Sequence, residues 1–215
     1  MSLQWRRWTI LTAVILCASF AHASMAQTPA SKSASKESAK PSAKSSAKSS
    51  AKPSDAKSAA TAAAGGAEPA LIGQYGTWGA YVANPNGKKV CFALAKPSSS
   101  KTNPPNRPRD PAYAFISTRP AEKVTNEVSI MIGYQLKPGS ESTLEVGSAR
   151  YAMYSQGDGL WIKNAAEEDG MVAALRKGAD VTVKGVSAKG TESSDTFALK
   201  GLSQALDRLA QDCRR

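Results

Sequence analysis

The stretch that decides the fold is residues 75–95, which read YGTWGAYVANPNGKKVCFALA. In its outer segments, 75–83 and 88–95, the residue type alternates with a period of two, which is the period of a β-strand. Between them, Asn84-Pro85-Asn86-Gly87 is a strong turn signal, because proline presets one backbone angle and Asn-Gly tolerates the left-handed angles of tight hairpins. The stretch therefore predicts a β-hairpin.

Short strand patterns continue to the C-terminus, and two helical patterns interrupt them. One helix begins at Asn164 and ends near Lys177, and the other begins near Leu202. Residues 96–111 contain five prolines and predict an irregular loop. The pattern predicts a mainly β fold, an antiparallel β-sandwich of immunoglobulin-like type with one or two short helices, including a C-terminal helix. The further strands are expected at residues 112–118, 127–134, 142–146, 150–155, 160–163, 180–186 and 195–200.

The first 26 residues have the pattern of a cleavable signal peptide. Arg6 and Arg7 precede an apolar run of about ten residues, which is too short to span a bilayer comfortably. Small residues then place the cleavage after Ala23 or Ala26, and an uncleaved anchor is the alternative. His22 is the only histidine, so removal of this segment leaves none. We expect export to the periplasm or the outer envelope.

Residues 27–67 consist almost entirely of alanine, serine, lysine and proline. Without aromatic or bulky aliphatic side chains they cannot bury enough apolar area to offset chain entropy, and Pro41 and Pro53 interrupt any helix. We expect a disordered linker with a net charge of +5, from seven lysines against Glu37 and Asp55. Six of the lysines recur at every fourth position and are the expected contacts to polyanions: Lys32, Lys36, Lys40, Lys44, Lys48 and Lys52.

A flexible polycation attracts polyanions through the release of counterions. For an exported protein we expect anionic lipid, lipopolysaccharide or wall polymer as the partner, and not nucleic acid, so that peripheral contact with a membrane is compatible with the sequence. The alternative is that the charge only keeps a spacer extended and soluble. The remaining domain, residues 68–215, carries 19 basic and 15 acidic residues, a net charge of +4.

Two cysteines, Cys91 and Cys213, remain after removal of the signal peptide. In an oxidising compartment an even number of cysteines indicates a disulfide, and two separate buried thiols are the alternative. Cys213 lies on the apolar stripe of the C-terminal helix, and Cys91 shares a strand face with Lys89 and Ala93, whereas the bulkier residues form the other face. If the helix packs over that face, the bond staples the helix to the sheet.

Signals for catalysis are weak. Without a histidine, Ser-His-Asp and Cys-His arrangements are excluded, and paired cysteines leave no thiolate as a nucleophile or metal ligand. The sequence has no phosphate-binding loop, dinucleotide fingerprint or zinc spacing, so we expect neither a cofactor nor a metal. These features favour a binding or structural module over an enzyme. The alternative is a hydrolase that cleaves envelope or surface polymers with paired carboxylates.

The candidate ligand contacts are aromatic and basic side chains. Trp78, Tyr81 and Trp161 can stack on sugars or on a protein partner if they are exposed, whereas buried they are ordinary core. Arg107 and Arg109 lie in the proline-rich segment and form a second candidate patch, because loops often carry function.

The order of these residues resembles a known family. Residues 76–81 (GTWGAY), a turn and residues 90–95 (VCFALA) are similar to the opening of the invasion-associated locus B proteins, and residues 196–202 (TFALKGL) before a short helix resemble their ending. Many members have a cysteine just after the tryptophan strand, and this chain has none there. That departure leaves Cys91 free to pair with Cys213.

The resemblance covers roughly residues 75–213. It implies an exported β-sandwich from a Gram-negative, often host-associated bacterium, and some relatives are implicated in entry into host cells. It implies no catalytic residues. The sequence as a whole therefore predicts a non-enzymatic module of the cell envelope that supports host interaction or invasion.

Overall fold

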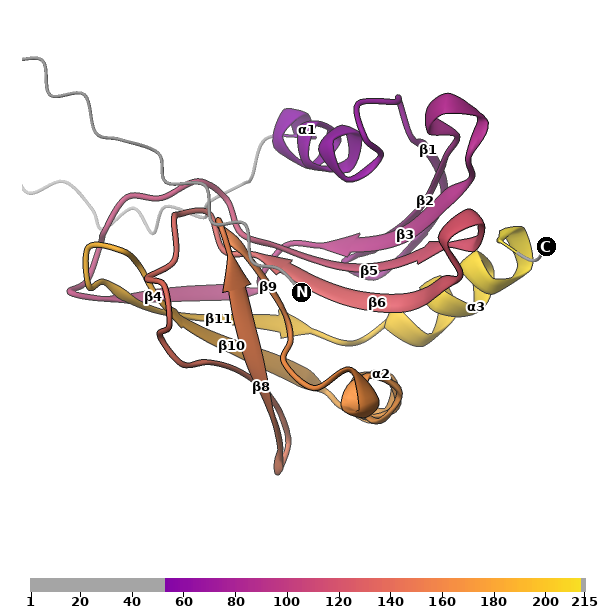
Figure 1. Ribbon diagram of the computed structural model, residues 1–215. Coiled ribbons are helices and arrows are strands. Elements are labelled where there is room, and N and C mark those ends of the chain that lie inside the picture. The colour runs from indigo at the N-terminus through magenta and orange to yellow at the C-terminus, as the bar shows by residue number, and fades with distance from the viewer. Residues whose placement is uncertain (1–52, 214–215) are drawn as a thin grey trace, which may run out of the picture. The chain divides into compact units, whose positions relative to one another are not determined.

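The structure, a computed structural model, describes residues 53–213 (Figure 1). The predicted signal peptide, residues 1–26, lies outside the described residues, as do the six regularly spaced lysines from Lys32 to Lys52. Within the described part the chain forms eleven strands and three α-helices. None of the described helices is both long and apolar enough to cross a membrane.

The eleven strands pair antiparallel in one continuous sheet, in the order β1-β2-β3-β5-β6-β9-β8-β7-β10-β11-β4. The predicted mainly β, antiparallel class with a C-terminal helix is thus confirmed. The strands are β1 (Ala70–Tyr75), β2 (Trp78–Ala83), β3 (Val90–Ala95), β4 (Ser99–Asn103), β5 (Tyr113–Arg119), β6 (Val124–Met131), β7 (Ser142–Val146), β8 (Ala149–Gln156), β9 (Gly159–Ile162), β10 (Asp180–Val186) and β11 (Glu192–Ala198).

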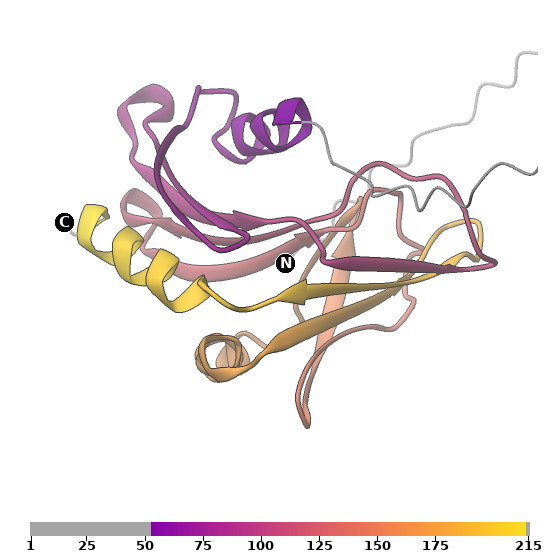
Figure 2. The ribbon, with the colours of Figure 1, turned by 180° about the vertical axis from the view of Figure 1, so that it is seen from behind.

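The sheet folds over on itself, so that both of its halves contribute to one apolar core (Figures 1 and 2). Ile116 of β5 and Ile130 of β6 belong to the first half, and Leu144 of β7, Val183 of β10 and Phe197 of β11 belong to the second. All five side chains are buried. This inner face accounts for the sandwich character that the alternating pattern predicts.

The predicted hairpin forms β2 and β3. Its turn contains a short 3₁₀ segment, Pro85–Gly87, in which Asn86 and Gly87 have positive φ angles of 52° and 75°. Tyr81 and Phe92 are opposite each other in the ladder. The Asn-Gly pair thus supplies the left-handed angles that the turn needs.

The sequence did not predict β1 and β4, the two edge strands of the sheet. β4 lies within residues 96–111, which were expected to form an irregular loop, and that prediction is wrong for residues 99–103. The strand pairs with β11 on one side only, and its side chains are mostly exposed. Because neither face of β4 is buried, its sequence shows no alternation between apolar and polar residues.

The helix predicted from Asn164 is divided into a 3₁₀ turn, Ala165–Glu167, and α2, Glu168–Lys177. The Asn164 carboxamide oxygen accepts the Ala166 N–H at 3.2 Å, and its amide group donates to the Glu167 carboxylate at 3.0 Å. Asn164 therefore caps the turn and not the α-helix itself.

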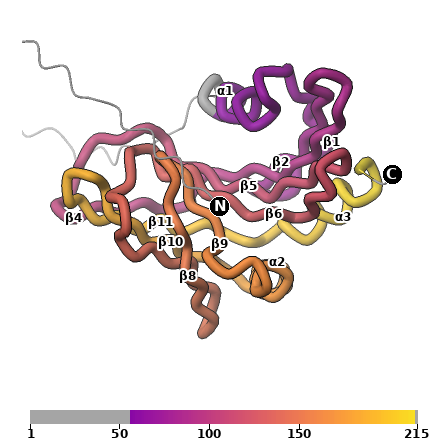
Figure 3. Tube along the Cα trace, in the orientation of Figure 1, coloured from indigo at the N-terminus to yellow at the C-terminus, as the bar shows by residue number. Residues whose placement is uncertain are grey.

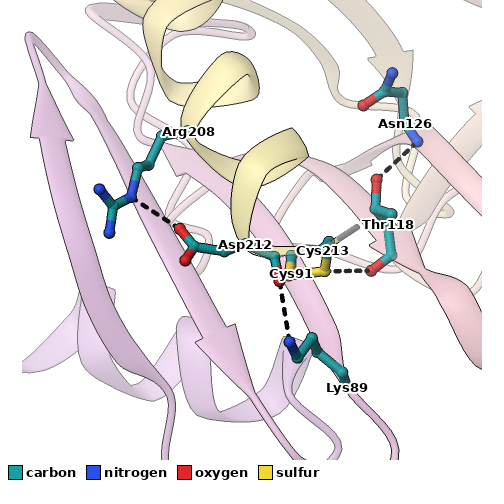
Figure 4. Close-up of a disulfide and its surroundings, with 7 residues drawn as sticks. All are labelled: Lys89, Cys91, Thr118, Asn126, Arg208, Asp212 and Cys213. Atoms are coloured by element: carbon teal, nitrogen blue, oxygen red, sulfur yellow. Dashed lines mark hydrogen bonds and ion pairs between the residues drawn. A yellow bond between two sulfur atoms is a disulfide. The ribbon is translucent and has the colours of Figure 1, made fainter. Parts of the chain in front are cut away.

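α3 (Leu202–Asp212) packs on the small-residue face of β2 and β3, and Cys213 directly after it is bonded to Cys91 (Figure 4). The predicted disulfide and its role as a staple are confirmed. Beside it, the Lys89 ammonium group donates to the Asp212 carbonyl at 3.0 Å. The cysteines are 122 residues apart, and closing a loop of that length stabilises the fold by about 5 kcal/mol in the chain-entropy description.

α1 (Pro53–Ala63) lies in the segment whose composition predicts a linker. It covers the outer face of β2, β3 and β5, opposite the face that α3 covers (Figures 1 and 3). Ala60 is fully buried there, and so is Ala64 just after the helix. Proline is tolerated in the first turn of a helix, and alanine is both the best helix former and small enough for close packing on a sheet. The linker expectation therefore does not describe this part of residues 27–67.

Candidate functional site

A buried ion pair fastens the proline-rich loop, residues 104–112, to the sheet. Arg109 forms a two-pronged salt bridge with Asp195 of β11, and their side chains are only 9% and 0% exposed. The guanidinium group also donates to the Ile132 carbonyl at 2.9 Å. Because separating a buried pair leaves an uncompensated charge, these contacts set the position of the loop.

Tyr134 lies beside this ion pair. The Arg109 guanidinium is 5.9 Å from the centre of the Tyr134 ring, within the range of a cation–π contact. The Tyr134 hydroxyl donates to the Gly185 carbonyl at 3.2 Å and lies 2.6 Å from the Ser193 hydroxyl. Burial raises the pKa of Tyr134, because the protein surroundings solvate a phenolate less well than water does.

Gly133 allows the loop to approach the end of β6 closely. Its φ is +80°, and a Cβ at this position would lie 2.0 Å from the Asp110 carbonyl oxygen. The Asp110 N–H in turn donates to the Gly133 carbonyl at 3.0 Å. A larger residue would strain the backbone and push the loop away.

Together these contacts shape a cleft of about 480 Å³ between the loop and the β10–β11 turn. We call it the loop cleft. Its lining includes Thr102, Arg107, Pro108, Tyr134, Gln135 and Lys189. An adjoining hollow, which contains Lys101, shares Thr102 and Arg107 with the loop cleft.

The loop cleft presents positive charge that has no partner. Arg107 and Lys189 are exposed, and among the described residues neither side-chain cation has a hydrogen bond or an ion pair. The Arg107 backbone N–H donates to the Thr102 hydroxyl oxygen at 3.1 Å, which joins the arginine to β4. A guanidinium fork matches the geometry of a carboxylate or phosphate, so this arrangement can bind an anion.

The structure thus separates the two arginines that the sequence grouped together. Arg107 faces solvent in the cleft, and its role as a ligand contact stays a prediction. Arg109 is paired with Asp195, which lies 86 residues later in the sequence. Through this pair Arg109 anchors the loop. Sequence reasoning missed Lys189 and Asp195, because no local pattern relates either residue to the loop.

The three predicted aromatic contacts do not form one site. Trp78 is buried in the inner core, where its indole N–H donates to the Ala198 carbonyl at 2.9 Å. Tyr81 stacks on Phe92 on the outer face, with ring centres 5.3 Å apart. Trp161 on β9 is partly exposed and stacks on Tyr154. Tyr154 was not among the contacts predicted from the sequence.

The acidic residues near Trp161 bear on the hydrolase alternative. Asp110, Glu127 and Asp158 line a groove that also contains Trp161, and Glu127 is occupied by an ion pair with Arg119. Among residues 53–213, no group of three or more histidine, cysteine or acidic side chains could hold a metal ion. Among the described residues Asp110 and Asp158 have no ion pair, and the hydrolase alternative stays a prediction.

Glu168, at the start of α2, has a structural role. Its carboxylate accepts the Val128 backbone N–H at 3.0 Å and so joins the helix to β6. Burial is the main reason that the pKa of Glu168 is raised, and the negative charges of Glu127 and Asp169 add to the effect.

The fold and the cleft define a disulfide-closed, mainly β domain with a basic surface cleft. The chain belongs to the family described as Invasion associated locus B (IalB) protein, whose family model matches residues 78–210. The predicted family is thus confirmed. No curated protein and no solved structure matches the chain. The matched range includes the loop cleft and Cys91, and it excludes α1, β1 and Cys213.

Proposed function

We propose that this protein is an exported, non-enzymatic binding module of the cell envelope, and that the loop cleft is its specific contact to anionic envelope material. Three features support this: the sequence pattern of residues 1–26, the disulfide between Cys91 and Cys213, and membership in a family named for association with invasion. Disulfides persist in oxidising compartments such as the periplasm.

The observation that carries the proposal is the distribution of charge in the loop cleft. Arg109 is neutralised by Asp195 and holds the loop, whereas Arg107 and Lys189 remain exposed and without partners among the described residues. Because Arg109 fixes the loop, the backbone at Arg107 needs no ordering when a ligand binds, and only the side chains of Arg107 and Lys189 have to be immobilised. Phosphate and carboxylate groups are the chemistry that such cations recognise.

The lysine-rich segment adds an attraction of a different kind. Its charge of +5 attracts polyanions without a defined geometry, and this attraction weakens steeply with salt. We propose that this segment concentrates the protein at the anionic surface, and that the loop cleft selects the group that is bound. Support of host interaction or invasion would follow from this placement at the cell surface.

The test compares two charge reversals of equal size. The variant Arg107→Glu/Lys189→Glu changes the cleft, and Lys88→Glu/Lys200→Glu changes two exposed lysines elsewhere that likewise have no side-chain partner among the described residues. Binding is measured by co-sedimentation with phosphatidylglycerol vesicles, with purified lipopolysaccharide and with an acidic wall polymer. We expect the cleft variant to lose at least about tenfold in affinity for one of these ligands, because each basic residue near an anionic surface contributes about 1 kcal/mol.

The three ligands identify the source of the anionic group, and salt separates the cleft from the lysine-rich segment. Deletion of residues 27–52 should weaken binding mainly at low salt. Equal losses in the two charge-reversal variants would show that only overall charge matters and would contradict a specific cleft.

A further inference from the structure

Tyr154 and Trp161 form a stacked pair of rings on the outer face of β8 and β9, two neighbouring strands in Figure 1. We call this pair the aromatic platform. The two residues are directly opposite each other in the ladder, and their ring centres are 5.9 Å apart at an angle of 27°. Tyr154 is 45% exposed, and among the described residues Leu71 is the only other large hydrophobic residue that is exposed.

A glycine lets the tryptophan lie flat along its strand. A Cβ on Gly159 would be 2.3 Å from the Trp161 ring, and the methyl group of Met131 would lie 3.1 Å away on another side. The indole therefore occupies the space above Gly159 that a side chain would fill. This position holds the indole against the sheet, with the Tyr154 ring stacked beside it.

Two hollows of mixed polarity adjoin the aromatic platform. Tyr154 lines a hollow of about 560 Å³ together with Thr143, Ser155 and Lys163. Trp161 lines a groove of about 510 Å³ that also contains Asp158. A ligand that lies across both rings can therefore reach hydroxyl and charged groups on either side.

An exposed pair of aromatic rings with hydroxyl and charged groups beside it matches a carbohydrate. A pyranose ring presents C–H groups on its faces and hydroxyl groups around its rim, and the faces pack on aromatic rings. A protein partner fits less well, because a stable protein interface covers about 800 Å² on each side and this platform offers two rings. A polyanion also fits less well, because both Lys163 and Asp158 border the platform.

We propose that the aromatic platform binds an oligosaccharide chain, with Tyr154 and Trp161 stacking on successive sugar rings. This inference rests on the proposed function as a binding module and names a second class of ligand for it, at a site separate from the loop cleft. The platform and the loop cleft share no lining residue.

Tryptophan fluorescence provides a direct test. In residues 27–215 the only tryptophans are Trp78 and Trp161, and Trp78 is buried, so quenching by acrylamide reports mainly on Trp161. The protein is titrated with a tetramer of β-1,4-linked N-acetylglucosamine and with cellotetraose. We expect at least one of them to protect Trp161 from acrylamide in a saturable manner. Trp161→Phe removes the reporter and serves to measure the residual signal of the buried Trp78.

Variants locate the contact. Tyr154→Ala should weaken binding roughly fivefold to tenfold through loss of one stacked ring, whereas Tyr154→Phe keeps the ring and should retain affinity. Gly159→Ala displaces the indole and should weaken binding as well, with thermal unfolding as the check on folding. Leu71→Ala removes an exposed apolar side chain on β1 and should leave binding unchanged.

The outcomes separate this inference from the proposed function. Absence of saturable protection by both oligosaccharides, or equal binding by Tyr154→Ala and the unchanged protein, would overturn the platform. Binding of the anionic ligands would then still support the loop cleft. Conversely, Arg107→Glu/Lys189→Glu should keep the oligosaccharide signal, and loss of that signal in this variant alone would place the sugar in the loop cleft.

Discussion

The two faces of β3 are covered by helices of opposite character. On the inner face the strand presents the small residues Cys91, Ala93 and Ala95, and α3 meets them with its leucines, Leu202, Leu206 and Leu209. On the outer face the strand presents the larger residues Val90, Phe92 and Leu94, and α1 and the residues just after it meet them with alanines, among them Ala56, Ala59, Ala60 and Ala64. Large side chains thus oppose small ones on both faces, as close packing requires.

The difference between the faces lies in what each helix contributes. A fully buried leucine stabilises a fold by about 1.5–3 kcal/mol, whereas a single buried methyl group contributes about 0.8 kcal/mol. α3 buries several leucines and is also joined to β3 by a disulfide. α1 has no disulfide to the sheet among the described residues. We therefore expect α3 to unfold with the whole domain and α1 to detach more easily.

The largest expected effect is that of the disulfide. Replacing both cysteines, Cys91→Ala/Cys213→Ala, should lower the free energy of unfolding by about 5 kcal/mol, because the unfolded chain regains the entropy of a long loop. Urea unfolding of the variant, compared with the unchanged protein with and without reductant, measures this. A loss below about 1 kcal/mol would show that packing alone holds α3.

The next largest effect concerns the ion pair of Arg109 and Asp195. Asp195 is one of the buried residues of β11. Asp195→Asn should cost about 3–5 kcal/mol, because it leaves the Arg109 guanidinium buried without a countercharge. The matched double variant Arg109→Met/Asp195→Leu removes both charges and should recover most of the loss. If the single variant is as stable as the double variant, the pair does not anchor the loop.

A smaller effect is expected for one leucine of α3. Leu206→Ala should cost about 3 kcal/mol, since the side chain is almost fully buried and the helix cannot collapse freely into the cavity. Leu71→Ala on the exposed edge strand is the control and should change stability by less than about 0.5 kcal/mol. Thermal or urea unfolding distinguishes the two variants. Equal effects would contradict the inner position of Leu206.

The smallest effect should follow from removal of α1. Deletion of residues 53–63 should cost less than about 2 kcal/mol, because the apolar burial by alanines is small and is partly offset by the entropy of ordering the helix. The deletion exposes Phe92 and Phe115, so binding of a hydrophobic dye should increase. A loss as large as that of Leu206→Ala, or unchanged dye binding, would remove the contrast between the two faces.

The parts of the fold that were predicted correctly have strong local signals. The Asn-Gly turn indicates the hairpin, and the apolar stripe of the last helix together with the small residues beside Cys91 indicates where that helix packs. β4 has no such signal, because an exposed edge strand is held mainly by its backbone ladder and buries no apolar face. The residues of α1 were assigned to a linker because their composition, rich in alanine, gives no sign of burial. The helix packs on the outer face of β2, β3 and β5, which the sequence does not show.

The candidate sites likewise depend on contacts that no local sequence pattern shows. Arg107 and Arg109 are two residues apart, and their different roles depend on Asp195, which no local pattern places beside the loop. Trp161 was a predicted contact, but its partner Tyr154 becomes apparent only from the register of β8 and β9. Trp78 was a predicted contact as well, and its burial reflects the folding of the sheet over its own inner face.

By itself the sequence determined the mainly β class, the hairpin and the family, because each depends on residue types and short spacings that a linear pattern preserves. The sequence also predicted the disulfide, but the bond across 122 residues depends on how α3 packs over β3. Only the tertiary structure decided which face of each strand is covered, which arginine is free and which aromatic rings meet. These properties depend on contacts between residues far apart in the chain. Burial changes the role of a side chain without any change in its own sequence neighbourhood.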